Sequence, residues 1–107
     1  DIERAAKMCA QTGYSNSGQS CISVQRIYVE STVVDSFVGK LIENVEKLVI
    51  GNPLDPSTDI GTMVDEQAAN RVMQWINEAV EEGAQILTGA KQTGANITPT
   101  VLLYFIL

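Results

Sequence analysis

The sequence of 107 residues has room for one ordinary domain with a modest core, and 45% of its residues are hydrophobic, as in a globular chain. The formal net charge is −6 and no lysine or arginine cluster is present, so we expect no binding to nucleic acid or to anionic membranes. Histidine is absent, which excludes a histidine triad or a histidine zinc site within the chain, and we expect no metal site.

The cysteine count and the start of the chain predict a compartment. The chain opens with Asp-Ile-Glu-Arg rather than a secretory signal, and its most apolar run, residues 101–107, is too short to cross a bilayer. Two cysteines without any other sign of secretion suit a reducing cytoplasm, where both thiols stay free. We therefore expect a cytoplasmic protein without a disulfide.

The first half of the chain predicts a helix, a loop, a strand and a second helix. Residues 1–11 have helical apolar spacing, Gly13 ends the helix, and a polar loop follows. Residues 21–30 are rich in apolar and β-branched side chains and predict a mainly buried strand. The segment 32–50 predicts an amphipathic helix, because its apolar residues recur at spacings of three and four. Its first residues, Thr-Val-Val-Asp, have the spacing of a capping box and predict the start of the helix.

The second half predicts one helix and two strands. A helix is expected over 65–82, a short strand over 84–87, and a polar turn region over 89–96. Residues 97–107 predict a second apolar strand that Pro99 interrupts. Strands separated by helices favour an α/β fold in which helices pack on a parallel or mixed sheet.

One thiol lies at the predicted boundary between the polar loop and the first strand. Cys21 follows the polar, glycine-containing segment 13–20 and directly precedes β-branched residues. A nucleophilic cysteine needs such a position, open to substrate, near backbone N–H groups and held by rigid structure. From spacing alone, a small buried residue at a strand start remains the alternative. Cys9 lies on the apolar face of the first helix, which favours a buried and inert thiol.

The amino-acid sequence around this thiol resembles the nucleophile segment of the aldehyde dehydrogenase superfamily. Residues 16–26 read Asn-Ser-Gly-Gln-Ser-Cys-Ile-Ser-Val-Gln-Arg, and the segments 51–61, 82–89 and 99–102 follow in the order that the family pattern has. Members of the family are several times longer. The resemblance therefore implies that residues 1–107 form a single partial domain, part of the catalytic domain, without the dinucleotide-binding domain.

The resemblance also implies a reaction. The Cys21 thiolate would attack an aldehyde to give a thiohemiacetal, hydride would pass to NAD or NADP, and water would release the carboxylic acid from a thioester. In the family, the glutamate general base, the oxyanion-binding asparagine and most of the cofactor site lie outside the part matched here. We therefore expect this chain alone to bind no cofactor and to be inactive. Its partners would be a small aldehyde, the remainder of the parent enzyme and further copies in a homo-oligomer.

Four further residues are candidates for binding substrate or cofactor. Ser20 and Ile22 flank the cysteine and would touch the substrate, with ordinary strand packing as the alternative. Tyr14 stands where the family often has phenylalanine, which places a hydroxyl close to the substrate approach. Arg71 occupies a position where some members have a basic residue near the cofactor ribose; a surface cation is the alternative.

We interpret the remaining motif residues as structural. Gly18 permits a backbone conformation that other residues avoid, and Asn16 and Gln19 can tie the loop through side-chain-to-backbone hydrogen bonds. Direct chemistry by Asn16 or Gln19 is the alternative. Arg26 is expected to pair with an acid elsewhere in the parent enzyme.

Two functions of other classes stay open. The chain could be a non-catalytic assembly or interaction domain that keeps the fold, with Cys21 idle. It could also be a free-standing thiol protein, which a Cys-x-x-Cys pair or a base within the chain would have favoured. The sequence of residues 20–26 most resembles the matching segment of family members that act on small polar aldehydes, such as lactaldehyde-like or phosphonoacetaldehyde-like substrates.

Overall fold

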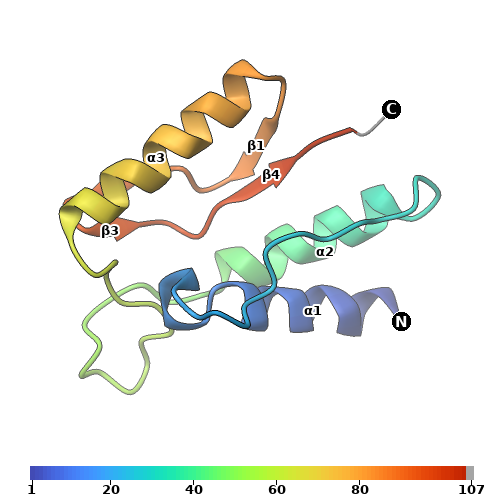
Figure 1. Ribbon diagram of the computed structural model, residues 1–107. Helices are drawn as coiled ribbons and strands as arrows, with labels where there is room; N and C mark the ends of the chain where they lie inside the picture. The colour runs from blue at the N-terminus through green and yellow to red at the C-terminus, as the bar shows by residue number, and fades with distance from the viewer. Residues whose placement is uncertain (106–107) are drawn as a thin grey trace. The chain divides into compact units, whose positions relative to one another are not determined.

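The computed structural model describes residues 1–105, which fall into two compact units on either side of residue 60 (Figure 1). The first unit contains α1 (Ile2–Gly13), η1 (Ser15–Gly18) and α2 (Val34–Glu46). The second contains α3 (Glu66–Glu81), β1 (Gln85–Thr88), β2 (Gln92–Thr93), β3 (Asn96–Ile97) and β4 (Val101–Leu103). The three predicted helices are all present; α1 and α3 are close to their expected bounds, and α2 is shorter than expected.

The first unit is built on the packing of α1 against α2. The carboxylate of Asp1 accepts a hydrogen bond from the Arg4 amide at 3.0 Å and caps α1. One turn apart on the buried face lie two alanines, Ala6 and Ala10, whose small side chains permit close approach of the second helix. The facing core comes from α2 at the same spacing: Phe37, Leu41 and Val45.

Helix α2 starts later and ends earlier than the sequence predicts. It spans Val34–Glu46, with Val33 at the N-cap and no capping hydrogen bond from a side chain. The expected capping box at Thr32 is therefore wrong. The amide of Val33 instead donates to the Glu30 carbonyl oxygen at 3.1 Å, so a backbone turn over 30–33 occupies the place where the first helical turn was expected.

The strand predicted over 21–30 is also absent. Residues 23–30 have no regular secondary structure and pair with no strand among residues 1–105; Figure 1 shows the segment running from the loop after α1 to the start of α2. Most of their side chains are exposed; Tyr28, for example, is 77% exposed. The physical reason is that a strand needs a neighbouring backbone for its N–H and C=O groups, and the described residues offer none here.

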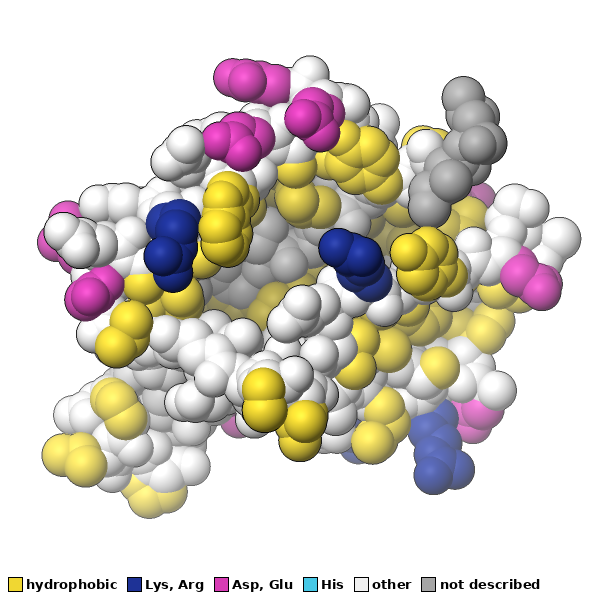
Figure 2. Space-filling view, viewed as in Figure 1, with side chains coloured by type: hydrophobic (Ala, Val, Ile, Leu, Met, Phe, Trp, Pro, Cys, Tyr) yellow, Lys and Arg dark blue, Asp and Glu magenta, His cyan; other side chains and the backbone are white. Residues whose placement is uncertain are grey.

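Helix α3 carries the core of the second unit. The Asp65 carboxylate caps it by accepting from the Ala68 amide at 2.7 Å, as the predicted start requires. Ala68, Ala69 and Ile76 are buried. The opposite side of the C-terminal half is acidic and exposed, and Figure 2 shows these carboxylates over the end of α3. Gly83, at φ +108°, ends the helix in a conformation that suits glycine.

The strands of the second unit form two antiparallel ribbons rather than a parallel or mixed sheet. β1 pairs with β4, and β2 pairs with β3 in a tight hairpin inside the region predicted as a polar turn. The short connection between β2 and β3 allows only antiparallel pairing of these two strands, because parallel neighbours need a long crossover. The one parallel contact described is an isolated bridge between Ile50 and Ile60 in the first unit. The class remains α/β.

Of the strand predicted over 97–107, Ile97 is the last residue of β3 and Val101–Leu103 form β4, and the interruption expected at Pro99 lies between them. Residues 106–107, at the end of that prediction, lie outside the described residues. Gly89 lets the chain turn into this region: it has φ +85°, and a Cβ there would collide with the backbone of Pro99.

Candidate active site

The segment from the end of α1 to Val24 forms a closed loop that carries Cys21. The amide of Val24 donates to the carbonyl oxygen of Thr12, in the last turn of α1, at 3.3 Å. Beside this bond, a Cβ on Gly13 would lie 3.1 Å from the Val24 carbonyl oxygen. The chain thus leaves the helix at Gly13 and returns to it at Val24, which fixes both ends of the loop.

The first part of the loop is a left-handed turn. Asn16, Ser17 and Gly18 have φ values of 53°, 57° and 74°, so three consecutive residues occupy a region that is costly for residues with a Cβ. Side chains support the turn. The amide group of Asn16 donates to the Gln19 carbonyl oxygen at 3.5 Å, and the side-chain amide of Gln19 donates to the Asn16 carbonyl oxygen at 3.3 Å. These bonds are the kind expected of loop-shaping residues.

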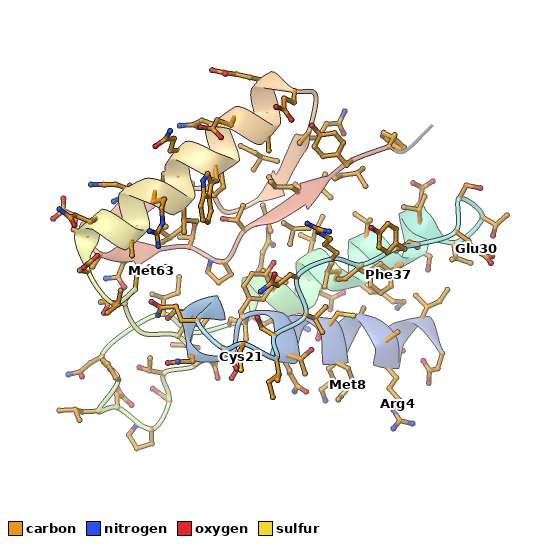
Figure 3. The ribbon with its side chains drawn as sticks, in the orientation of Figure 1. Arg4, Met8, Cys21, Glu30, Phe37 and Met63 are labelled. Carbon is orange, nitrogen blue, oxygen red and sulfur yellow. The ribbon has the colours of Figure 1, made fainter. Side chains whose placement is uncertain are left out.

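The second part of the loop is a tight turn centred on the thiol. The Ser20 carbonyl oxygen accepts two hydrogen bonds from Ser23, one from the amide at 3.1 Å and one from Oγ at 2.8 Å. Cys21 and Ile22 are the two central residues of this turn and point outward. Both are exposed, and Ile22 reaches 88% exposure. Figure 3 shows Cys21 on the loop beside the end of α1.

The exposed turn gives the Cys21 thiol two properties that a nucleophile needs. It is a free thiol open to solvent, whereas Cys9 is a free thiol half-buried in α1. The backbone amides of Cys21 and Ile22 make no hydrogen bond to any of residues 1–105. Two N–H donors are therefore available close to the sulfur, where a negative charge would develop on a bound carbonyl oxygen.

Tyr14 and Ser20, two of the predicted substrate contacts, belong to the same loop. Both are half-buried, and Ile22, the third, is the exposed neighbour of Cys21. Burial raises the pKa of Tyr14 from 10.0 to about 12. The predicted substrate contacts Tyr14, Ser20 and Ile22 therefore all lie on the loop that carries Cys21.

The predicted cofactor contact lies elsewhere. Arg71 is on α3, in the second unit, and its side chain is exposed. Its guanidinium carbon lies 5.4 Å from the centroid of the Trp75 ring, a cation–π contact that orients the group while its N–H donors remain outside. Arg26, predicted to be structural, is exposed on the segment 23–30.

Ser23 was not predicted as a site residue, although it holds the turn around the thiol with two donors. A Ser-x-x-Ser spacing across the cysteine was the available signal, since a hydroxyl three residues on can bond back to a turn carbonyl.

Among residues 1–105, no group of three metal-ligating side chains occurs and no helix is long and apolar enough to cross a membrane.

Comparison with known proteins identifies the family. The sequence model of the aldehyde dehydrogenase family matches residues 1–105. The 3-sulfolactaldehyde dehydrogenase of Priestia megaterium is 53% identical over 102 residues, which cover 95% of this chain and 21% of that protein. The lactaldehyde dehydrogenase of Methanococcus vannielii is 44% identical, again over 95% of this chain and 22% of that protein.

Solved structures agree. The lactaldehyde dehydrogenase of Escherichia coli is 35% identical and has a TM-score of 0.89, covering 95% of this chain and 22% of its own. The NADP-dependent glyceraldehyde-3-phosphate dehydrogenase of Bacillus halodurans, solved with NADP, is 34% identical with a TM-score of 0.90, covering 95% and 21%. The chain spans about a fifth of the length of these relatives. It belongs to the aldehyde dehydrogenase family.

Proposed function

We propose that this chain supplies the nucleophile of an enzyme that oxidises a small aldehyde to a carboxylic acid with NAD or NADP, and that Cys21 is that nucleophile. The observation that carries the proposal is the Ser20–Ser23 turn, which displays a free, exposed thiol beside two unpaired amides in a chain of the aldehyde dehydrogenase family. Cysteine suits this chemistry because its thiolate forms near neutral pH.

The chain's own groups support the first steps. Attack of the Cys21 thiolate on the carbonyl carbon forms a C–S bond and leaves a negative charge on the former carbonyl oxygen. The amides of Cys21 and Ile22 are the donors that could stabilise this charge. Loss of hydride from the same carbon to the acceptor leaves a thioester. Water then breaks the C–S bond, which gives the carboxylic acid and restores the thiol.

The identity of the hydride acceptor is inferred from the relatives. A similar solved structure is an NADP-dependent enzyme in complex with NADP, which supports NADP or NAD for the parent of this chain. Residues 1–105 show no strand followed by a glycine-rich loop and a helix, the unit that commonly binds a pyrophosphate. We therefore propose that the 107-residue chain does not hold the cofactor or turn over aldehydes by itself. Arg71 is the proposed contact to the cofactor ribose.

The substrate we propose is a small polar aldehyde. Two relatives at 53% and 44% identity are named for 3-sulfolactaldehyde and lactaldehyde, both of which carry polar groups close to the aldehyde carbon. Tyr14 and Ser20, both half-buried, are the polar residues of the loop that we propose as contacts of such a substrate. Assembly in a cytoplasmic homo-oligomer is part of the same proposal; the free thiols are consistent with that compartment.

A chimaeric enzyme tests the function. The matched 102 residues would replace the corresponding segment of the 3-sulfolactaldehyde dehydrogenase, and formation of reduced cofactor would be followed with a panel of small aldehydes. We expect turnover in the chimaera and in its Cys9→Ser variant, and none in Cys21→Ser. Undiminished turnover in Cys21→Ser would refute the assignment. A folded chimaera without activity in which Cys21 forms no aldehyde adduct would favour an assembly role instead.

A further inference from the structure

We propose that Ser23 is a positioning residue for the nucleophile, acting through the turn that presents Cys21; this inference rests on the proposed function. Its amide and its hydroxyl both donate to one acceptor, the Ser20 carbonyl oxygen, at 3.1 and 2.8 Å. The two bonds span Cys21 and Ile22, the residues whose thiol and backbone amides carry the proposed function. Fixing the ends of the turn therefore fixes the relative positions of thiol and amides.

The other side-chain bonds described in the loop act at different places. The bonds between Asn16 and Gln19 lie before Ser20, on the left-handed turn. The bond from Val24 to Thr12 ties the chain after the thiol to α1 but does not join the two sides of the turn. Between these supports, Ser23 makes the described hydrogen bonds that close the turn over Cys21. Its hydroxyl is part-buried, so water competes less well for the Ser20 oxygen than at an open position.

The proposed site must hold a nucleophilic thiol and a charge-stabilising amide at a fixed separation. Small displacements of either group should therefore lower kcat more than they weaken the binding of substrate. Misplacement of a reacting group lowers the probability of a near-attack arrangement, while the substrate still occupies the site. Removal of the Ser23 hydroxyl should accordingly lower kcat and leave KM nearly unchanged. We expect a decrease of about three- to tenfold, which corresponds to the loss of one ordinary hydrogen bond from the folded turn.

Two variants of equal shape isolate the hydroxyl. Ser23→Thr keeps the donor and Ser23→Val removes it, while both add the same branched bulk. Ser15→Ala is the control in the same loop, because its exposed hydroxyl makes no hydrogen bond within residues 1–105. In the chimaera, Ser23→Thr should retain a kcat close to that of the parent, and Ser23→Val should lower kcat by about three- to tenfold. The control should behave as the parent, with all melting temperatures alike.

A second arm does not depend on activity. In the 107-residue chain, amide hydrogen exchange at residue 23 reports opening of the turn, and we expect about three- to tenfold faster exchange in Ser23→Val than in Ser23→Thr. Equal exchange and equal kcat in these two variants would overturn the role of Ser23, even if Cys21→Ser abolishes turnover. If Cys21→Ser stays active instead, the proposed function fails, and faster exchange in Val would then describe a loop without that catalytic role.

Discussion

The amide of Val24 donates to the carbonyl oxygen of Thr12, and this bond of 3.3 Å closes a loop in which Cys21 is displayed beside the end of α1. A helix leaves its last carbonyl groups without partners inside the helix, so the return of the chain at Val24 satisfies one of them. The packing of α1 on α2 then supports the loop from one side. The thiol is exposed without lying on a free terminus or a long unsupported segment.

The two thiols should differ in reactivity. We expect iodoacetamide to label Cys21 faster than Cys9 in the folded chain, because Cys21 is exposed and Cys9 is half-buried in α1. Mass spectrometry of peptides after brief labelling gives both rates in one sample. The difference should vanish in denaturant. Preferential labelling of Cys9 in the folded chain would contradict the geometry of the loop.

Gly89 should be required for the stability of the second unit. Alanine there would adopt φ +85° and collide with the backbone of Pro99, so we expect a loss of about 2–5 kcal/mol in the free energy of unfolding. Gly94 is the matched control, since its φ is +59° but a Cβ there meets nothing, and Gly94→Ala should cost about 1–2 kcal/mol. Urea titration followed by fluorescence of Trp75, the chain's single tryptophan, measures both. Equal losses would show that the contact with Pro99 is not tight.

The helices were predictable because their start and stop signals are local. Asp65 caps α3 through its own side chain, and glycines lie at the predicted ends of α1 and α3. The start of α2 was not predictable from its pattern, since Thr32 fits a capping box yet a backbone turn ends at Val33 instead. The hydrogen bond from the Val33 amide to the Glu30 carbonyl oxygen outweighs the preference of Thr32 for a helix start, and no sequence motif indicates that bond.

The strands were predicted less well, because a strand exists only with a partner. Residues 21–30 have strand composition, but pairing is decided by residues far along the chain or outside it. The β1–β4 register likewise depends on contacts between distant segments, and its bulge between Ile86 and Thr88 has no local signature. The sequence predicted that Cys21 follows a polar loop, but it placed the thiol at the start of a strand, whereas the structure has it in an exposed turn. The Ser-x-x-Ser spacing allows a bond across this turn, but only the structure shows that Ser23 donates two hydrogen bonds to the Ser20 carbonyl oxygen.

The cap of α3 should contribute measurably to stability. Asp65→Ala removes the carboxylate that accepts from the Ala68 amide, and we expect a loss of about 0.5–2 kcal/mol. Thr32→Ala tests the capping box that the structure does not contain, and should change the free energy of unfolding by less than about 0.5 kcal/mol. Circular dichroism during urea titration measures both variants. A larger loss for Thr32→Ala than for Asp65→Ala would contradict the described helix starts.

Tyr14 should make the folded chain sensitive to alkaline pH. Burial raises its pKa from 10.0 to about 12, so the folded chain holds the phenolic proton more tightly than the unfolded chain does. The stability from this group is fully present below pH about 10 and is lost as the pH rises through about 12. Tyr14→Phe should lack this decline, while Tyr28→Phe, at an exposed ring, should keep it. Thermal melts across that range would decide; identical declines in all three chains would exclude Tyr14 as the cause.

The most direct test is to trap the covalent intermediate on the thiol. The active chimaera would be mixed with aldehyde and oxidised cofactor, quenched in acid within the first turnovers and digested for mass spectrometry. We predict an acyl group on the peptide that contains Cys21, present only when cofactor is supplied, and none on the peptide that contains Cys9. An acyl group on Cys9, or continued turnover in Cys21→Ser with no acyl group on the chain, would contradict the assignment of Cys21 as the nucleophile.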